Sequence, residues 1–424
     1  MWHTRASPDE HYAVFRGMPA GVGPVLAIQE FRRASLSGPV SNSPVARQTT
    51  GQVLGILLAV GVGLSGQSVG RLGLAVRQDP IKLVLDAFAT HAVVALGEGP
   101  HNNLAGHAFR LALIREPGFA DVVDDIVVEF GSATQQGVID RYVRGEPVPL
   151  SELRHVWEDT TAVGPVWDTP IYAEFFEAVR ALNATSPPER RLRVLLGDAP
   201  IDWSNTRTRA DVRRAGLQKG PHMAALVRRE VIAKQRRALM IYGDSHFTGR
   251  TLSDPKAAFN RIERMPGGTR VFTIHSTYTD LLAWQPDAAT WTLPAAFTTK
   301  GTTTGARPLA QFLPIPPAPG WNRLTMTSQF DAIIVLGRPG ELKMAALTAG
   351  RCADQSYMQM RLARMALNVE QVRRTSIYNL KQICAARLRD AGNGAGLVSR
   401  LSLPTQHVLR GVIIQDVRLA HPPE

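Results

Sequence analysis

The chain has 424 residues, of which 44% are hydrophobic and 20% are charged, so it can bury the core of one large domain or two. The net charge is +12, and the basic residues concentrate in residues 207–237 and 337–424. Neither stretch is interleaved with aromatic residues, so we interpret both as solvated helix faces and do not expect nucleic-acid binding. Cys352 and Cys384 are too few for a disulfide framework or a Cys-x-x-Cys zinc site, and they leave the redox compartment open.

The first part of the chain is expected to lie outside the folded core. Residues 1–50 are rich in Pro, Ser, Gly and Arg without sustained periodicity, and we predict that they are disordered. Residues 51–68 contain an apolar run, 53–64, that is too short for a bilayer, which needs about 20 residues, but is typical of a signal peptide. This pattern predicts an exported protein, periplasmic or secreted, that contacts a membrane only through this segment. The alternative is a buried Gly-rich element in a cytoplasmic protein.

Residues 79–337 alternate between two kinds of pattern. Amphipathic stripes predict helices over 79–90, 104–115, 171–182 and 222–236. Short apolar runs predict buried parallel strands at 92–96, 126–128, 192–196, 238–242, 271–274 and 332–336. The alternation predicts an α/β fold with a central, mostly parallel sheet flanked by helices. Residues 338–424 are predicted to form a basic helical extension, with helices over 358–369 and 377–389.

Each of the first four apolar runs ends on a carboxylate, and two of these ends add a histidine. The residues are Glu98 with His101, Glu129, Asp198, and Asp244 with His246. In open α/β sheets, ligands bind just beyond the carboxyl ends of the strands. The sequence therefore predicts a site at this edge of the sheet.

The spacing of these residues indicates two kinds of chemistry. Glu98 and His101 flank a Gly-Pro turn, which can hold an acid and an imidazole as orienter and base, or as two metal ligands. Asp244 and His246 repeat the combination after a later strand. Glu98, His101 and His246 are also the candidate metal ligands. In the alternative, these two residues have no catalytic or binding function: Glu98 is only a capping residue, and His101 is only a partly exposed histidine.

Two further residues are secondary candidates, and several reaction classes are excluded. Asp198 follows a Gly in a pattern common in turns, His222 begins a basic helix that can point back to the same edge, and His107 is interpreted as a packed or surface residue. The sequences Gly-x-Ser-x-Gly, Gly-x-Gly-x-x-Gly and Walker A are absent at strand–helix junctions, which argues against a serine esterase, a dinucleotide enzyme and an ATPase. Water activation by histidine, with or without a metal, and ligand binding through histidine remain.

Four segments in this order resemble the superfamily that contains erythromycin esterases, ChaN-type haem-binding proteins and Tiki/TraB proteins. They are Val94 to His101, Val127 to Glu129, His222-Met223-Ala224, and Gly243 to His246, and the likeness covers roughly residues 80–337. The family commonly has an Arg just before the helical Met-Ala pair, where this chain has Lys219-Gly220-Pro221-His222.

The resemblance implies an activity and a set of site residues. In the esterase branch a histidine activates water without a required metal, and the corresponding centre here consists of Glu98, His101, Glu129 and His246. The ChaN-like branch implies haem, and the Tiki-like branch implies a divalent metal. We therefore expect a hydrolase that cleaves an ester or related bond of a small molecule, with Asp244 as a further catalytic candidate. The alternative is a haem- or metal-binding protein that uses the same histidines.

Overall fold

The computed structural model describes residues 72–248, 258–280, 285–313, 320–368 and 370–391, and the backbone of a short pair of strands near the C-terminus. Residues 1–50 and the apolar segment 51–68 lie outside the described residues. Within the described ranges no helix is both long and apolar enough to cross a membrane. The longest, α14 (Glu370–Asp390), is strongly charged. This finding corrects the expected membrane contact, whose segment is itself not described.

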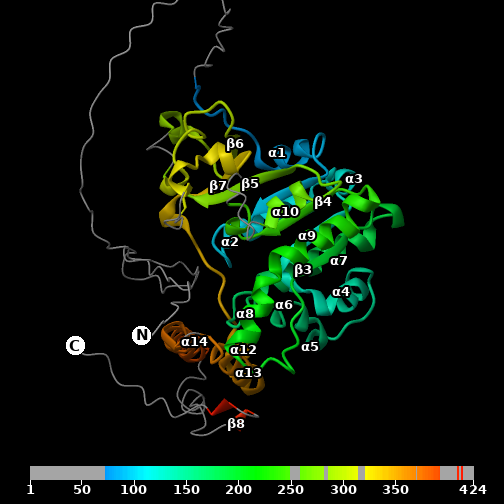
Figure 1. Cartoon of the computed structure of the whole chain (residues 1–424), viewed down its shortest axis with the longest axis vertical. Helices are drawn as coiled ribbons and strands as arrows, with labels where there is room; N and C mark the ends of the chain where they lie inside the picture. The colour runs from blue at the N-terminus through cyan, green and yellow to red at the C-terminus, as the bar shows by residue number, and fades with distance from the viewer. Residues whose placement is uncertain are drawn as a thin grey trace, which may run out of the picture.

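A seven-stranded sheet lies at the centre of the molecule, with the strand order β3-β2-β4-β1-β5-β7-β6 (Figure 1). The strands are β1 (Val93–Gly97), β2 (Asp125–Ser132), β3 (Arg193–Asp198), β4 (Ala238–Tyr242), β5 (Val271–Tyr278), β6 (Ala295–Thr298) and β7 (Ala332–Gly337). All neighbours pair in parallel except β6, which runs antiparallel to β7 at the edge. The prediction of a mostly parallel α/β sheet is confirmed.

Helices cover both faces of this sheet, which explains why its inner strands are apolar without alternation. Val94 and Leu96 of β1 belong to a core that includes residues of α1 (Pro80–Ala87), α2 (Leu104–Arg115) and α7 (Pro170–Thr185). Val93 and Ala95 of the same strand belong to a second core, with residues of α9 (Lys219–Glu230) and α10 (Ala258–Arg264). The shorter helices are α3 (Phe119–Val122), α4 (Gln136–Val143), α5 (Leu150–Leu153), α6 (His155–Glu158), α8 (Arg209–Leu217) and α11 (Met326–Gln329).

Two predicted helices illustrate how local signals set helix ends. The helix predicted at 104–115 is α2, and Asn103 caps it by accepting a hydrogen bond from the Gly106 N–H. The helix predicted at 222–236 begins earlier, at Lys219, and ends at Glu230. It ends there because the chain passes into a 3₁₀ turn that is closed by Gln235 in the left-handed conformation, with φ of 53°.

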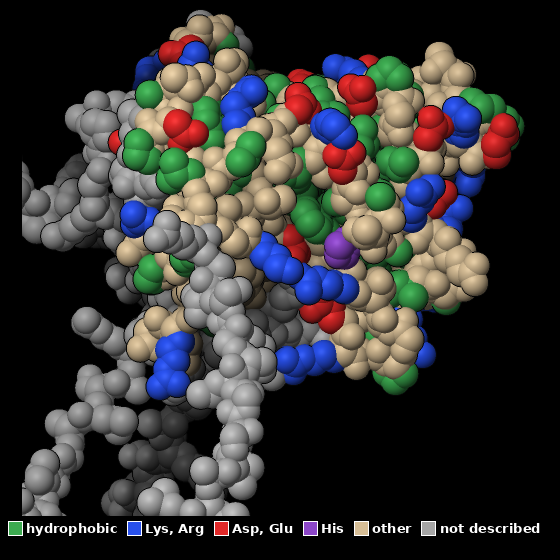
Figure 2. Space-filling model, turned by 90° about the horizontal axis from the view of Figure 1, so that it is seen from above, with side chains coloured by type: hydrophobic (Ala, Val, Ile, Leu, Met, Phe, Trp, Pro, Cys, Tyr) green, Lys and Arg blue, Asp and Glu red, His purple; other side chains and the backbone are tan. Residues whose placement is uncertain are grey.

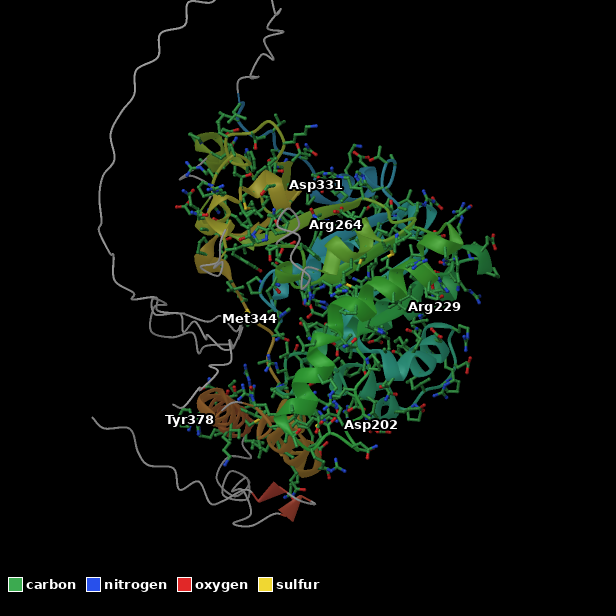
Figure 3. The ribbon with its side chains drawn as sticks, viewed as in Figure 1. Asp202, Arg229, Arg264, Asp331, Met344 and Tyr378 are labelled. Atoms are coloured by element: carbon green, nitrogen blue, oxygen red, sulfur yellow. A yellow bond between two sulfur atoms is a disulfide. The ribbon has the colours of Figure 1, made fainter. Side chains whose placement is uncertain are left out.

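The C-terminal extension is helical, as predicted, and a disulfide links two of its helices. It contains α12 (Ala349–Ala353), α13 (Gln355–Met365) and α14, and Cys352 of α12 is bonded to Cys384 of α14. These helices lie at the end of the molecule away from β6 (Figure 1). Figure 3 shows Met344 on the segment that connects the sheet to them and Tyr378 on α14. A short antiparallel pair, β8 (Val408–Leu409) and β9 (Val412–Ile413), follows.

The basic residues of the extension are not all solvated, contrary to our interpretation. The side chains of Arg351, Arg361 and Arg364 are 12%, 1% and 11% exposed, and each forms an ion pair with an acid between residues 158 and 168. Elsewhere the charges are mixed: on the face shown in Figure 2, Lys and Arg side chains lie next to Asp and Glu side chains. Part of the net positive charge thus holds the extension against the α/β part.

Candidate functional site

The carboxyl ends of four adjacent strands, β3, β2, β4 and β1, carry the predicted site residues. Gly97 at the end of β1 is in register with Tyr242 at the end of β4, and Val128 of β2 is in register with Ile241. The residues that follow these positions are therefore neighbours although they are far apart in the sequence. This arrangement brings Glu98, His101, Glu129 and His246 to one edge of the sheet.

The loop that carries Glu98 and His101 is held in one conformation by its own residues. Gly99 and Asn102 have φ of +68° and 66°, which place both in the left-handed region. The Asn103 side-chain amide donates hydrogen bonds to the carbonyls of Glu98 (2.9 Å) and Pro100 (2.6 Å) while it also caps α2. The loop thus presents its side chains from a fixed backbone.

Glu98 and His101 form a pair in which the histidine keeps one ring nitrogen open. His101 Nδ1 lies 2.8 Å from Glu98 Oε2, and a carboxylate can only accept, so Nδ1 is the donor. The other oxygen, Oε1, accepts from the Tyr172 hydroxyl at 2.9 Å and lies 3.4 Å from Arg110 Nη1. Glu98 is 1% exposed, whereas the His101 side chain is 26% exposed. Within the described residues, the Nε2 of His101 is therefore the atom left for an external partner.

Glu129 and His246 form a second pair, assembled from two strand ends. Glu129 Oε2 accepts from the Gly243 N–H at 2.8 Å, and Oε1 lies 3.0 Å from His246 Nε2. Lys219 Nζ lies 3.8 Å from the same Oε1. Glu129 is thus anchored on both oxygens and is buried.

The two pairs approach each other at Gly243. A Cβ at this position would lie 3.2 Å from His101 Cε1 and 3.4 Å from Glu129 Oε2, so the His101 ring and the Glu129 carboxylate border the same glycine. An alanine at this position would require the His101 ring to move by a few tenths of an ångström. The glycine that closes β4 therefore permits the approach of the two pairs.

In both pairs the partner favours the charged form, so the pKa of His101 is raised and the pKa of Glu129 is lowered. Burial lowers the pKa of His101, but the charge and hydrogen bond of Glu98 and the charge of Glu129 raise it more, so the pKa lies above its ordinary value. Burial raises the pKa of Glu129, but His246, Lys219 and His101 lower it more, and the result lies well below the usual range. Glu129 is thus ionised at neutral pH, and the raised pKa of His101 favours its protonated form.

Asp198 joins the site through Lys219. Its carboxylate accepts from the backbone N–H and the hydroxyl of Thr161, the latter at 2.9 Å, and lies 3.3 Å from Lys219 Nζ. Lys219 therefore lies between Asp198 and Glu129. His222, one turn later on α9, hydrogen-bonds to the Leu196 backbone, and burial lowers its pKa. Its Nε2 is buried and has no hydrogen-bond partner among the residues that the structure describes.

Asp244 does not join either pair directly; its carboxylate points behind the His101 loop. Oδ1 lies 2.8 Å from His275 Nδ1, and Oδ2 accepts from the Gly99 N–H at 3.1 Å. A Cβ on Gly97 would lie 2.0 Å from Asp244 Oδ1, so a glycine is required there. Asp244 supports the loop that carries His101, and its predicted catalytic role stays a prediction.

Several residues of the site were not predicted from sequence. Arg110 and Tyr172 lie among the apolar residues of α2 and α7, where helical periodicity assigns them to the core. The signal that could have identified Arg110 is its charge among the buried residues of that helix. Trp167, whose ring packs edge-on against His101 with centroids 4.4 Å apart, comes from a loop without periodicity. Lys219 was noted only as a departure from the family pattern. His107 is buried, 3.0 Å from Glu174, as a packed residue.

The candidate metal ligands do not converge. Among the residues that the structure describes, no group of three or more His, Cys, Asp or Glu side chains is arranged to hold a metal ion. His101 turns Nδ1 to Glu98, and His246 turns Nε2 to Glu129, so the two histidines bind different carboxylates. The donor set does not fit a metal. For a haem iron, which histidine often ligates, the open Nε2 of His101 is the group that fits.

Comparison with known proteins gives a likeness of fold at low similarity. No protein-family model matches the chain, and no curated protein matches it significantly. A succinoglycan biosynthesis protein is 12% identical with a TM-score of 0.42, over 67% of this chain and 100% of that one. A mutant erythromycin esterase in its open conformation is 12% identical with a TM-score of 0.38, over 63% and 94%. ChaN of Campylobacter jejuni, described with cofacial haem, is 14% identical with a TM-score of 0.32, over 48% and 88%.

These similar structures include an erythromycin esterase and a ChaN protein, as in the superfamily that the motifs resemble. Their identities and TM-scores are too low to support an activity. The functional argument therefore depends on the geometry of the two glutamate–histidine pairs.

Proposed function

We propose that the protein is a hydrolase in which His101 removes a proton from water that attacks an ester or related bond. One observation carries this proposal: His101 is bonded through Nδ1 to a buried carboxylate, and its Nε2 is left open at the edge of the sheet. This is the arrangement of a general base with its orienting acid.

Each neighbour has a role in this proposal. Glu98 keeps the proton of neutral His101 on Nδ1 and stabilises the imidazolium that forms when Nε2 accepts a proton. Tyr172 and Arg110 hold Glu98 in place. Glu129, ionised and beside the same glycine as the His101 ring, polarises the water, and His246 and Lys219 hold Glu129. A base positioned in this way contributes about 10²–10⁴-fold to the rate.

The test measures turnover of a panel of aryl esters, lactones and peptides by the full chain and its variants. We expect His101→Asn to lower kcat/KM by about 10²–10⁴-fold. The matched control is His91→Asn, because His91 precedes β1 at the opposite end of the strand that Glu98 follows. A wild-type rate in His101→Asn, or no turnover of any compound in the panel, would contradict the proposal.

The same variants separate hydrolysis from haem capture. Haem is titrated into the wild type, and the Soret band is followed. A saturable shift that disappears in His101→Asn, together with an absence of turnover, would assign haem binding to His101 instead.

We also propose that the protein is exported. The signal-like segment 53–64 suggests this, and the disulfide between Cys352 and Cys384 supports it because such bonds persist mainly in oxidising compartments. Thiol labelling of fractionated cells, followed by mass spectrometry, tests the proposal. Recovery of the full chain in the cytoplasm with both thiols reduced would contradict it.

A further inference from the structure

Residues 166–169 connect the His101 loop to the C-terminal helices. On the side of the loop, the Trp167 ring packs edge-on against the His101 ring with an interplanar angle of 73°. Thr169 Oγ1 donates to Asn102 Oδ1 at 2.6 Å, and Asn102 Nδ2 donates to the Val166 carbonyl at 3.0 Å. Three contacts, from residues 166, 167 and 169, thus link this segment to His101 and Asn102.

On the other side, Asp168 is held by α13. Its carboxylate accepts from Arg361 through Nε (2.6 Å) and Nη2 (2.6 Å), and from the Tyr357 hydroxyl at 2.5 Å. The side chains of Arg361 and Asp168 are 1% and 0% exposed. A two-bond guanidinium–carboxylate pair fixes direction as well as distance. The residue adjacent to Trp167 is therefore held in one orientation by a helix outside the α/β sheet.

Other contacts support the same segment and the same loop. Arg364 donates to the Glu158 carbonyl at 2.6 Å and pairs with Asp159 at 2.6 Å, at the start of the stretch that leads to Trp167. After β7, the chain passes directly beside the His101 loop, where Leu104 N–H donates to the Lys343 carbonyl and Ala345 N–H donates to the Asn102 carbonyl. The region beyond β7 therefore contacts the His101 loop both directly and through residues 166–169.

A buried ion pair is seldom needed for stability alone, because apolar residues of similar volume often serve equally well. Such a pair adds a defined geometry. Here it fixes Asp168, and the adjacent Trp167 carries the ring that packs on His101. We infer that Asp168 is a positioning residue: held by Arg361 and Tyr357, it keeps Trp167 against His101, so that the C-terminal helices complete the site. This inference rests on the proposed role of His101, but its test does not require turnover.

The test measures the rate at which diethyl pyrocarbonate modifies each histidine of the full chain, with mass spectrometry to resolve the positions. The variants are Arg361→Met, Arg361→Lys, Asp168→Asn and Trp167→Ala. We expect His101 to react about two- to tenfold faster in each, as one aromatic contact is lost or misplaced. His91 of the same molecule is the internal reference. The matched control is Arg389→Met, because Arg389 lies on an exposed position of α14.

A double variant separates positioning through Trp167 from general loosening. In a Trp167→Ala background, Arg361→Met is expected to add nothing further to the His101 rate, because the contact through which it acts is already gone. If Arg361→Met does not fold, Arg361→Lys and Tyr357→Phe replace it, since both keep most of the packing.

The inference is overturned if folded Arg361 and Asp168 variants leave the His101 rate unchanged, if His91 accelerates by the same factor, or if the effects of Trp167→Ala and Arg361→Met add. These outcomes differ from failure of the proposed function. If His101 is modified at the predicted rates but no compound is turned over, the hydrolase proposal is rejected and the positioning role of Asp168 is kept. If compounds are turned over but the modification rates of His101 are unchanged in the variants, the positioning role is rejected and the hydrolase proposal is kept.

Discussion

The two glutamate–histidine pairs use the same residue types but are built in opposite ways. Glu98 and His101 come from one short loop, whereas Glu129 and His246 meet only because β2 and β4 are neighbours. His101 binds its carboxylate through Nδ1 and leaves Nε2 open, while His246 binds through Nε2. The proposed general base thus belongs to the pair built from one loop, and the pair built from two strand ends holds Glu129.

The largest expected effect is on kcat/KM, and it should differ between variants of the two glutamates. Glu98→Gln keeps the shape of the side chain but removes the charge that stabilises the His101 imidazolium, so kcat/KM should fall by about 10²–10⁴-fold, which is the contribution of the base. Glu129→Gln should cost less, because His101 keeps its own partner. The comparison uses an ester that the wild type hydrolyses. Equal losses in the two variants would show that the pairs share one function.

The second prediction concerns Arg361, which holds Asp168 and is distant from the Glu98–His101 pair that it supports. Arg361→Met leaves the Asp168 carboxylate buried without its ion-pair partner, which should lower the free energy of unfolding by about 3–5 kcal/mol. Denaturant titration followed by circular dichroism measures this loss. Arg389→Met, on an exposed position of α14, should change stability by less than about 0.5 kcal/mol. A loss of only about 0–1 kcal/mol would mean that the pair behaves as a surface ion pair.

The third effect concerns acid stability and tests the second pair. The pKa of Glu129 is lowered in the folded state, so its contribution to stability is present above the pKa of the unfolded chain and is lost as the pH falls toward the folded value. Each unit of lowering corresponds to about 1.4 kcal/mol. As the pH falls below the ordinary glutamate pKa of 4.5, the wild type should therefore lose more unfolding free energy than Glu129→Gln. Identical losses would show that Glu129 is not held as an ion in the fold.

The smallest effect is a displacement of the pH dependence of turnover. His101 must be neutral to accept a proton, and its pKa is raised, so kcat/KM should increase with pH through a midpoint above the ordinary histidine value. Glu98→Gln removes a cause of that raised pKa, and the midpoint of its residual activity should move to lower pH. The pH profile of His246→Asn should move less. A larger shift in His246→Asn would make His246 the base.

Sequence patterns predicted the parts of this site that depend on local structure or on strand ends. Glu98 and His101 are close in sequence, so their pairing requires only one turn. Glu129 and His246 were placed at the same edge because parallel strands end together, although their direct contact depends on the order of β2 and β4. The α/β sheet followed from apolar runs that are buried on both faces.

The remaining residues depend on contacts that no local pattern encodes. Arg110 and Tyr172 lie in apolar helix stripes, and only the folded chain shows that they bind Glu98. Asp244 was placed at the correct strand end, but the 3₁₀ turn at Asp244–His246 directs the two side chains differently, one to His275 and the other to Glu129. The direction of a side chain in such a turn depends on its neighbours in space.

The bond between Asp168 and Arg361 spans 193 residues of chain, and this has a consequence for the order of synthesis. Domains generally fold from the N-terminus while the ribosome still extends them. The sheet strands and the His101 loop emerge first, and the helix that fixes Asp168 emerges much later. A nascent chain that stops after β7 thus carries His101 without the contacts from α13 to Asp168. By this inference, the timing of translation keeps the site incomplete until the last helices have been made.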